Sequence, residues 1–242
     1  MLGGDKLISI LLPCLNEQNA IAYCIDNAKL FLKQVNMPGE IIVIDNGSTD
    51  KTKIIALTKK VVVLEETALG YGNALMKGLA ASTGEIIFMM DSDGSYNLLD
   101  AQPFLELLGK DYDFVLGSRL KGEIFRGAMP WLHLHVGVPL LTRLLTFLIK
   151  LNISDAHCGL RAIRRDAINQ MKLSCSGMEF ASEMILEAAK ASLHIAEVPV
   201  SYRPRIGKSK LRTIRDGCRH LFVIISYFPH FMKNEFVTFS TR

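Results

Sequence analysis

The chain has 242 residues, a formal net charge of +4 and 49% hydrophobic residues, which suits one large α/β domain and excludes a globally disordered chain. No apolar run reaches the roughly 18 residues of a membrane-spanning helix, so we expect any membrane contact to be interfacial. The N-terminus has no basic-then-apolar leader, so no secretory signal is expected. The five cysteines are widely spaced without a C-x-x-C, which argues against a disulfide framework or zinc site and favours a reducing cytoplasm.

Short apolar runs alternate with amphipathic segments over the first 118 residues. Strands are expected at residues 7–12, 40–44, 61–64, 85–90 and 114–116. Helices are expected at residues 19–35, 50–60 and 71–82. Continuous apolar strands separated by helices predict an α/β fold, with a mostly parallel central sheet covered by helices on both faces.

Residues 119–153 differ, because they hold the single tryptophan, Trp131, together with several prolines and glycines and a very apolar second half. We predict two short amphipathic helices here, which face either a membrane or the protein core. Beyond them we expect strands at 157–163 and 195–202, and helices at 177–192 and 222–232. The predicted catalytic domain is 1–220, and 221–242 is an apolar C-terminal segment, either membrane-associated or the stub of a transmembrane region.

Residues 203–219 contain seven lysines or arginines and a single acid, Asp216. Such a cluster attracts phosphates, anionic lipid head groups or nucleic acid, and the alternative is a solvated basic face. No recognised nucleic-acid motif accompanies the cluster, and it lacks interleaved aromatic residues beyond Tyr202. We therefore expect no nucleic-acid partner.

Polar residues follow the ends of the predicted strands. They are Asn16 and Glu17, Asp45, Glu65, Asp91, and Ser118 with Arg119. In parallel α/β sheets, ligands bind at the carboxyl ends of the strands, so these side chains are expected to converge on one crevice. No G-x-G-x-x-G follows the first strand, which excludes a dinucleotide-dependent dehydrogenase.

The segment Asp91-Ser92-Asp93 places two carboxylates directly after a buried strand. Carboxylate oxygens suit Mg²⁺ or Mn²⁺, which can bridge a diphosphate and neutralise charge on a departing nucleoside diphosphate. The alternative is a simple Asx turn. Asp45 can bind a ribose or base, or form a turn, and Gly70 opens a helix at which backbone N–H groups can approach a phosphate.

The ordered motifs of this chain resemble family 2 glycosyltransferases of the GT-A fold, a Rossmann-like fold of nucleotide-diphospho-sugar transferases. The motifs are 12–17 (LPCLNE), 44–50 (IDNGSTD), 70–74 (GYGNA), 91–93 (DSD), 117–119 (GSR), 154–161 (SDAHCGLR), 177–183 (GMEFASE) and 207–211 (GKSKL). The similarity runs over about residues 7–220, and it is to the branch that contains dolichyl-phosphate mannose synthase and bacterial polyprenyl-phosphate glycosyltransferases.

The resemblance implies a metal and nucleotide-sugar site. Asp91 and Asp93 would hold the metal, with Ser95 as a further ligand, directly or through water. The nucleotide-sugar would contact Pro13, Leu15, Glu17, Asp45, Gly70, Ser92, Arg205 and Lys210, as well as Asp91 and Asp93. The family's arginine commonly lies three residues before the Gly of G-x-S-K, where this chain has Pro204, so Arg205 or Arg203 would replace it.

The resemblance also implies inversion by in-line attack on the anomeric carbon, with Asp93, Arg119 and Asp155 as the catalytic candidates. An acceptor phosphate needs no strong general base, whereas a hydroxyl acceptor does. Asp155, and after it Glu183, are the candidate bases, but Asp155 could instead pair with Arg161 or cap a turn. Acceptor phosphate would be bound by Arg119, Arg126 and Arg203. Arg126 and Arg143 are candidates for a lipid phosphate, and the alternative for both is simple solvation at the surface.

The sequence thus predicts a metal-dependent transferase that moves a sugar from a GDP- or UDP-sugar to a polyprenyl phosphate, dolichyl or undecaprenyl. It would act as a peripheral protein on the cytoplasmic face of the membrane. A transferase for a soluble or polysaccharide hydroxyl, and a non-catalytic nucleotide-sugar binding protein, are the alternatives. The sequence leaves open whether copies of the chain form a homo-oligomer.

Overall fold

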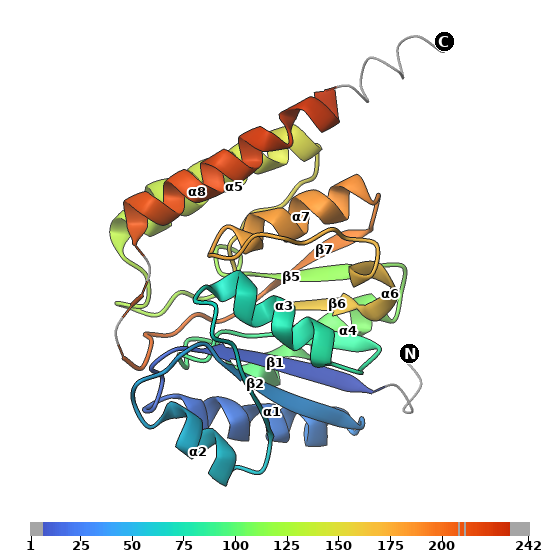
Figure 1. The fold of residues 1–242 in the computed structure, drawn as a ribbon. Coiled ribbons are helices and arrows are strands. Elements are labelled where there is room, and N and C mark those ends of the chain that lie inside the picture. The colour runs from blue at the N-terminus through green and yellow to red at the C-terminus, as the bar shows by residue number, and fades with distance from the viewer. Residues whose placement is uncertain (1–6, 208, 211, 233–242) are drawn as a thin grey trace.

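A seven-stranded sheet forms the centre of the protein in the computed structural model, which describes residues 7–207, 209–210 and 212–232 (Figure 1). The strands lie in the order β3-β2-β1-β4-β6-β5-β7. Their bounds are β1 Ile8–Cys14, β2 Gly39–Asp45, β3 Val62–Glu65, β4 Ile86–Met89, β5 Phe114–Ser118, β6 Arg161–Arg164 and β7 Ile195–Pro199.

The four strands from β3 to β4 are parallel, β6 runs antiparallel between β4 and β5, and β7 is parallel to β5. The predicted α/β fold with a mostly parallel sheet is confirmed. Because β6 is reversed, its first residue, Arg161, pairs with Met89 and Leu116 at the ends of β4 and β5. The residues just before Arg161 therefore lie at the same edge as the carboxyl ends of the parallel strands.

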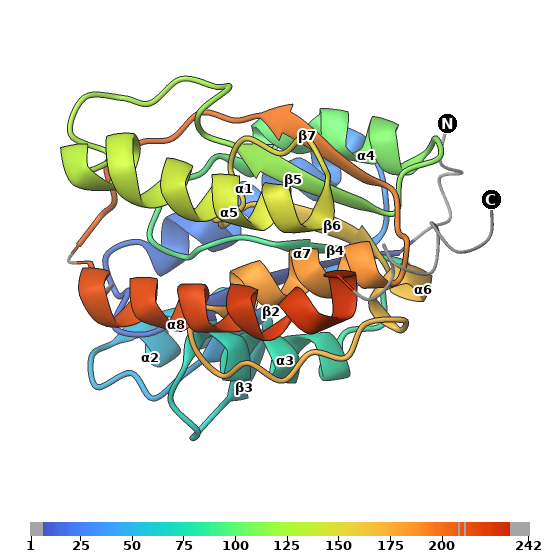
Figure 2. The same cartoon turned by 90° about the horizontal axis from the view of Figure 1, so that it is seen from above.

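Helices cover both faces of the sheet, as Figure 2 shows from above. The bounds are α1 Ile21–Val35, α2 Thr52–Thr58, α3 Tyr71–Ala81, α4 Gln102–Leu108, α6 Arg165–Ile168 and α7 Phe180–Lys190, with a short 3₁₀ turn at Leu98–Ala101. One core packs Ile8, Ile10 and Leu12 of β1 under α1 and α4. The other packs Leu11 of the same strand under α3 and α7, because side chains alternate along a strand.

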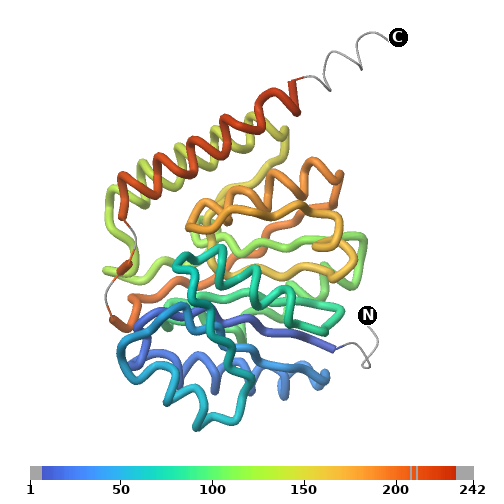
Figure 3. Tube along the Cα trace, in the orientation of Figure 1, coloured from blue at the N-terminus to red at the C-terminus, as the bar shows by residue number. Residues whose placement is uncertain are grey.

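Two long helices lie side by side over α7, and their shared course is visible in Figures 1 and 3. The first runs from residue 131 through a π-helical stretch, His133–Gly137, into α5, Val138–Ile149. The second is α8, Thr213–Ser226. The His133 ring lies 2.9 Å from the Thr213 hydroxyl, which joins the two helices near their N-terminal ends. Within the described residues, no helix combines the length and apolar character that crossing a membrane requires.

Three sequence expectations need correction here. One continuous helical segment replaces the two short helices, and the π-helical stretch His133–Gly137 lies just before Pro139, which interrupts regular α-helical hydrogen bonding. β6 begins at Arg161 and not at residue 157, since the preceding residues form a turn at the edge where the parallel strands end.

α8 begins at Thr213 and not at residue 222, and it runs through the predicted boundary at residue 220. Residues 233–242 of the predicted C-terminal segment lie outside the described residues. The elements α4 and α6 and the 3₁₀ turn were not predicted.

Candidate active site

Asp91 lies just beyond β4 and is held from two sides. The Tyr71 hydroxyl, at the start of α3, donates a 3.0 Å hydrogen bond to its Oδ1. Its Oδ2 faces Gly159, where a β-carbon would lie only 2.0 Å from that oxygen. Gly159 therefore leaves the space that the Asp91 carboxylate occupies, and it is brought there by the reversed direction of β6.

Asp93 is buried, and each of its carboxylate oxygens has a different partner. Oδ1 accepts hydrogen bonds from the Ser95 N–H, at 3.0 Å, and the Ser95 hydroxyl, at 2.5 Å. Oδ2 lies 3.3 Å from a guanidinium nitrogen of Arg205. The Ser95 hydroxyl thus orients Asp93, and direct metal coordination by Ser95 stays a prediction. The buried Ser92 hydroxyl has no hydrogen-bond partner within the described part of the chain.

The chemistry of this carboxylate pair fits a hard divalent cation. Burial, and then the nearby Asp93 charge, raise the pKa of Asp91 to about 6, while the Tyr71 hydrogen bond and the charges of Arg205 and Arg119 oppose that rise. The described residues contain no cluster of three or more His, Cys, Asp or Glu side chains arranged for a metal. Mg²⁺ is commonly held by one or two carboxylates, with substrate phosphates and water as its other ligands.

The predicted nucleotide residues gather at the ends of β1 and β2. Glu17 is buried and forms an ion pair with Lys210, whose ammonium also donates to the Asn16 carbonyl at 3.1 Å. Burial raises the pKa of Glu17, and the hydrogen bond and charge of Lys210 oppose that rise. Asp45 is buried and accepts a 3.3 Å hydrogen bond from the Ser48 N–H, so it shapes its own turn.

Three further predicted residues lie at the end of β1 and at the start of α3. Pro13 is buried in β1, and Leu15 is half-buried just after it. Gly70 caps α3 with a φ of 143°, and a β-carbon there would lie 2.1 Å from the Ser176 carbonyl oxygen. Its N–H donates to the Asn46 side chain at 2.7 Å. Gly70 therefore has a structural role, and phosphate binding by it stays a prediction.

Arg119 and Asp155 form a buried, bidentate ion pair. Arg119 Nε and Nη2 donate to the two Asp155 oxygens at 2.7 and 2.8 Å, and the Arg119 backbone N–H donates at 3.1 Å. The guanidinium also stacks on the Tyr202 ring, 5.2 Å from its centroid. Burial alone would raise the pKa of Asp155, but the Arg119 charge and hydrogen bonds hold it below its usual value.

The suggested pairing of Asp155 with Arg161 is wrong, whereas the suggested turn is present, because Asp155 Oδ1 accepts a 3.2 Å hydrogen bond from the His157 N–H. Arg161 instead donates to the backbone carbonyls of Ala156, Cys158 and Ala181. Glu183 is also occupied, because it accepts hydrogen bonds from the Ser174 N–H and hydroxyl and from the Cys175 N–H. Both candidate bases are therefore already bound to other groups.

Arg126 and Arg203 lie on two segments that run together. The Phe125 N–H donates to the Tyr202 carbonyl at 2.9 Å, and the Arg203 guanidinium lies over the Phe125 ring, 5.5 Å from its centroid. Arg126, next to Phe125, is exposed, and Arg203 is half-buried. The structure thus places Arg203 against the segment that carries Arg126.

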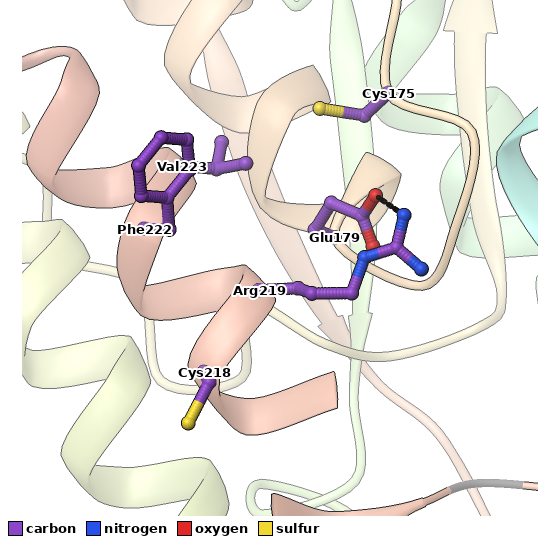
Figure 4. A pocket seen from close by; sticks show the side chains of 6 residues that line it. All are labelled: Cys175, Glu179, Cys218, Arg219, Phe222 and Val223. Atoms are coloured by element: carbon purple, nitrogen blue, oxygen red, sulfur yellow. Dashed lines mark ion pairs between the residues drawn. The ribbon is translucent and has the colours of Figure 1, made fainter. Parts of the chain in front are cut away.

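A pocket of about 520 Å³ lies between α8 and the N-terminal end of α7 (Figure 4). Its lining is Cys175, Glu179, Cys218, Arg219, Phe222 and Val223. Arg219 and Glu179 form a 2.9 Å ion pair in it. None of the predicted metal- or nucleotide-binding residues lines this pocket.

All five cysteines are free thiols in the structure.

Sequence reasoning missed Tyr71 and Gly159 as residues that shape the site. Both lie inside motifs, since Tyr71 follows Gly70 and Gly159 follows Cys158. A glycine between two otherwise ordinary core residues was the available signal. The contact of Gly159 with the Asp91 carboxylate could not be predicted, because Asp91 lies 68 positions earlier in the chain.

Residues 9–172 match the model of glycosyl transferase family 2. The chain belongs to this family. It is 41% identical over 226 residues to the low-salt glycan biosynthesis hexosyltransferase Agl6 of Haloferax volcanii, a match covering 93% of this chain and 54% of that protein. It is 29% identical over 212 residues to the dolichyl-phosphate hexose transferase of the same organism, with 87% of this chain and 89% of that protein covered. This family 2 glycosyltransferase therefore spans about half the length of the first relative.

Solved structures share the fold. The glucosyl-3-phosphoglycerate synthase of Mycobacterium tuberculosis, in complex with Mn²⁺, uridine diphosphate and phosphoglyceric acid, superposes with a TM-score of 0.73. The two chains are 22% identical, over 91% of this chain and 78% of the synthase. At that identity the likeness establishes the GT-A fold of this family 2 glycosyltransferase.

Proposed function

We propose that this family 2 glycosyltransferase moves a sugar from a GDP- or UDP-sugar to a polyprenyl phosphate at the cytoplasmic face of a membrane, with Mg²⁺ or Mn²⁺ as cofactor. The relative named dolichyl-phosphate hexose transferase supports the acceptor. The synthase crystallised with Mn²⁺ and uridine diphosphate supports the donor and the metal. The Asp91 and Asp93 pair is the matching feature of this chain.

The observation that carries the acceptor is an apolar surface on the two paired helices. Apolar side chains stand exposed along both, namely Trp131, Leu132, Val136, Leu140 and Phe147 on the first helix and Ile214, Leu221, Phe222 and Ile225 on α8. They recur at spacings of mostly three, four, seven and eight residues, so on each helix they share a side. Large exposed apolar patches mark membrane or protein contacts, and exposed Arg212 and Arg215 at the start of α8 suit anionic head groups.

This apolar surface follows the candidate active site closely along the chain. The backbone N–H groups of Arg203 and Ile206 donate to Ser95 and Asp93, at 2.9 and 2.7 Å. α8 starts only a few residues later, at Thr213, and is joined there to the other helix. A lipid embedded along the helices would thus carry its phosphate toward the carboxyl ends of the strands.

The state of the candidate bases favours a phosphate over a hydroxyl acceptor. Asp155 is a poor proton acceptor, because Arg119 engages both of its oxygens and lowers its pKa. A phosphate monoester already carries negative charge at neutral pH, since its second pKa is about 6, and it needs no base. Arg119 would offer its remaining nitrogen, Nη1, to this phosphate, with Arg126 and Arg203 as further cations.

Asp91 and Asp93 would hold the metal, kept in orientation by Tyr71, Ser95 and Gly159. When bound, the ion would neutralise the charge that develops on the departing nucleoside diphosphate. The base and ribose would lie against Pro13, Leu15 and Asp45.

A transfer assay tests the proposal. A panel of radiolabelled GDP- and UDP-sugars is offered with undecaprenyl phosphate, dolichyl phosphate, the unphosphorylated polyprenol and 3-phosphoglycerate. We expect label in the organic phase with a polyprenyl phosphate and none with the polyprenol. Labelled product from polyprenol or 3-phosphoglycerate alone, or no lipid product from any donor, overturns the acceptor.

Paired variants test the apolar surface. Phe147→Asp and Phe222→Asp should each weaken binding to anionic vesicles by roughly tenfold or more, because each removes an aromatic side chain from the bilayer contact. Ile54→Asp on α2, an apolar residue that is 63% exposed against 75% for Phe147 and 74% for Phe222, is the control and should bind vesicles as the wild type does. Equal binding to vesicles by the wild type and all three variants would contradict the proposed membrane contact.

A further inference from the structure

Residues 203–206, here called the covering segment, lie across the turn that holds Asp93. The Arg203 N–H donates to the Ser95 carbonyl at 2.9 Å, and the Ile206 N–H donates to the Asp93 carbonyl at 2.7 Å. Gly94 has a φ of +77°, and a β-carbon there would lie 2.8 Å from the Ile206 side chain. These contacts fix the backbone of the covering segment on either side of Arg205.

Arg205 faces the Asp93 carboxylate oxygen to which Ser95 does not donate. Oδ1 is taken by both the N–H and the hydroxyl of Ser95, while Oδ2 faces the Arg205 guanidinium at 3.3 Å. A divalent cation held by Asp91 and by this Oδ2 of Asp93 would lie close to the guanidinium. Since like charges repel at such short range, the cation and the guanidinium cannot share the oxygen at full strength.

A second cation shows the same arrangement a few residues later. Lys210 pairs with Glu17, a buried carboxylate of the predicted nucleotide site. Arg205 and Lys210 are both about one-third exposed, so either side chain can turn into solvent, and a cation bound at Asp91 and Asp93 would then compensate the buried Asp93 carboxylate. A nucleoside diphosphate would offer both cations new anionic partners.

We propose that Arg205 competes with the divalent cation for Asp93, and that a nucleoside diphosphate relieves this competition by taking over the guanidinium. Metal binding thus becomes conditional on the nucleotide, and the two bind cooperatively. The inference rests on the metal and donor parts of the proposed function and is independent of the acceptor.

Mn²⁺ affinity, measured from the electron paramagnetic resonance signal of free Mn²⁺, tests this inference without any transfer reaction. Wild type, Arg205→Gln and Arg205→Lys are titrated alone and with UDP or GDP. Arg164→Gln is the matched control, because it removes the same charge at the opposite edge, where Arg164 pairs with the first residue of β4. Thermal melting of each protein confirms that it is folded.

We expect wild type to bind Mn²⁺ at least about tenfold more tightly with one of the two nucleotides than alone. Arg205→Gln should bind Mn²⁺ about fivefold or more tightly than wild type without nucleotide, and the gain from nucleotide should shrink correspondingly. Arg205→Lys, which keeps a cation, and Arg164→Gln should both behave as wild type does.

Two results overturn the inference. One is an Arg205→Gln protein that binds Mn²⁺ no more tightly than wild type without nucleotide. The other is a wild type whose Mn²⁺ affinity neither UDP nor GDP raises. The lipid transfer assay can fail while this test succeeds, so the failures of the two proposals are distinguishable.

Discussion

Charged side chains are paired differently on the two sides of the candidate active site. Beside β1 and β4, the carboxylates of Glu17 and Asp93 pair with Lys210 and Arg205, cations from a distant segment whose side chains are 37% and 31% exposed. Beyond β5, Arg119 and Asp155 pair with each other, and their side chains are 10% and 0% exposed. The carboxylates on the first side are only 8% and 9% exposed, so their partly exposed cations can leave at small cost when another cation takes their place, whereas breaking the buried pair of Arg119 and Asp155 is costly. The first side is therefore built to exchange ligands, and the second to stay fixed.

The largest effect is expected on the fixed side. Asp155→Asn removes the charge that compensates Arg119 and should lower the free energy of unfolding by about 3–5 kcal/mol, measured by urea denaturation at pH 7. Asp26→Asn breaks an exposed pair with Lys59 and should cost only about 0–1 kcal/mol. Equal costs for the two variants would remove the contrast between buried and exchangeable pairs.

The pH dependence of this loss follows from the lowered pKa of Asp155. A carboxyl whose pKa is lower in the folded than in the unfolded protein stabilises the fold above its unfolded pKa, about 3.9. That stability disappears as the pH falls through the folded pKa. The difference between wild type and Asp155→Asn should thus be constant from pH 5 to 8 and shrink below about pH 4.

On the exchanging side, Asp93→Asn should lower turnover by about 10²–10³-fold, because one electrostatic partner of the transition state is lost. Its fold should survive, since Ser95 can still donate to the amide oxygen. Nucleotide binding measured by calorimetry should also lose its dependence on Mn²⁺. Binding that responds equally to EDTA in wild type and variant would contradict the metal assignment.

The sequence predicts the exchanging side better than the fixed side. The apolar strands before Asp45 and Asp91 are abrupt and β-branched or aromatic, so their ends, and the edge that they form, could be located by pattern alone. The residues that pair with each other across the site could not be located in this way. Arg119 and Asp155 are 36 positions apart, and Arg205 and Asp93 are separated by 112, so no local pattern joins them.

Helix starts show the same limit. α8 was expected at its apolar residues only, because Arg215, Asp216 and Arg219 in its first two turns resemble a polar loop. In the structure Asp216 accepts a 2.7 Å hydrogen bond from the Arg212 N–H and closes that first turn. A capping residue of this kind can be predicted once a helix is expected. Here the many basic residues hid the helical spacing of the apolar residues, so no helix was expected at this point.

The buried charge of Asp91, on the exchanging side, should lower the free energy of unfolding. Its pKa is raised to about 6, so its charged form disfavours the fold above that pH and has no effect below its unfolded pKa. Asp91→Asn should therefore raise the free energy of unfolding at pH 7 in EDTA by about 1–3 kcal/mol. The gain should fade as the pH is lowered from 7 to 4, and urea denaturation at each pH measures it. A variant less stable than wild type would show that the two carboxylates are already compensated.

Gly159 lies against the Asp91 carboxylate. Among the variants proposed, Gly159→Ala should have the smallest effect on function. The new β-carbon would lie 2.0 Å from Asp91 Oδ2, the end of a side chain that can rotate away, so folding should survive while the carboxylate is displaced. We expect the affinity for the Mn²⁺–nucleotide complex to fall roughly tenfold, as when the supports of metal ligands are altered elsewhere. Gly217→Ala on α8, where a β-carbon meets nothing within 4 Å, is the matched control and should leave this affinity unchanged. Equal affinities of wild type and Gly159→Ala would mean that the position of Asp91 Oδ2 does not matter for the cation, and that Asp93 alone defines the exchanging side.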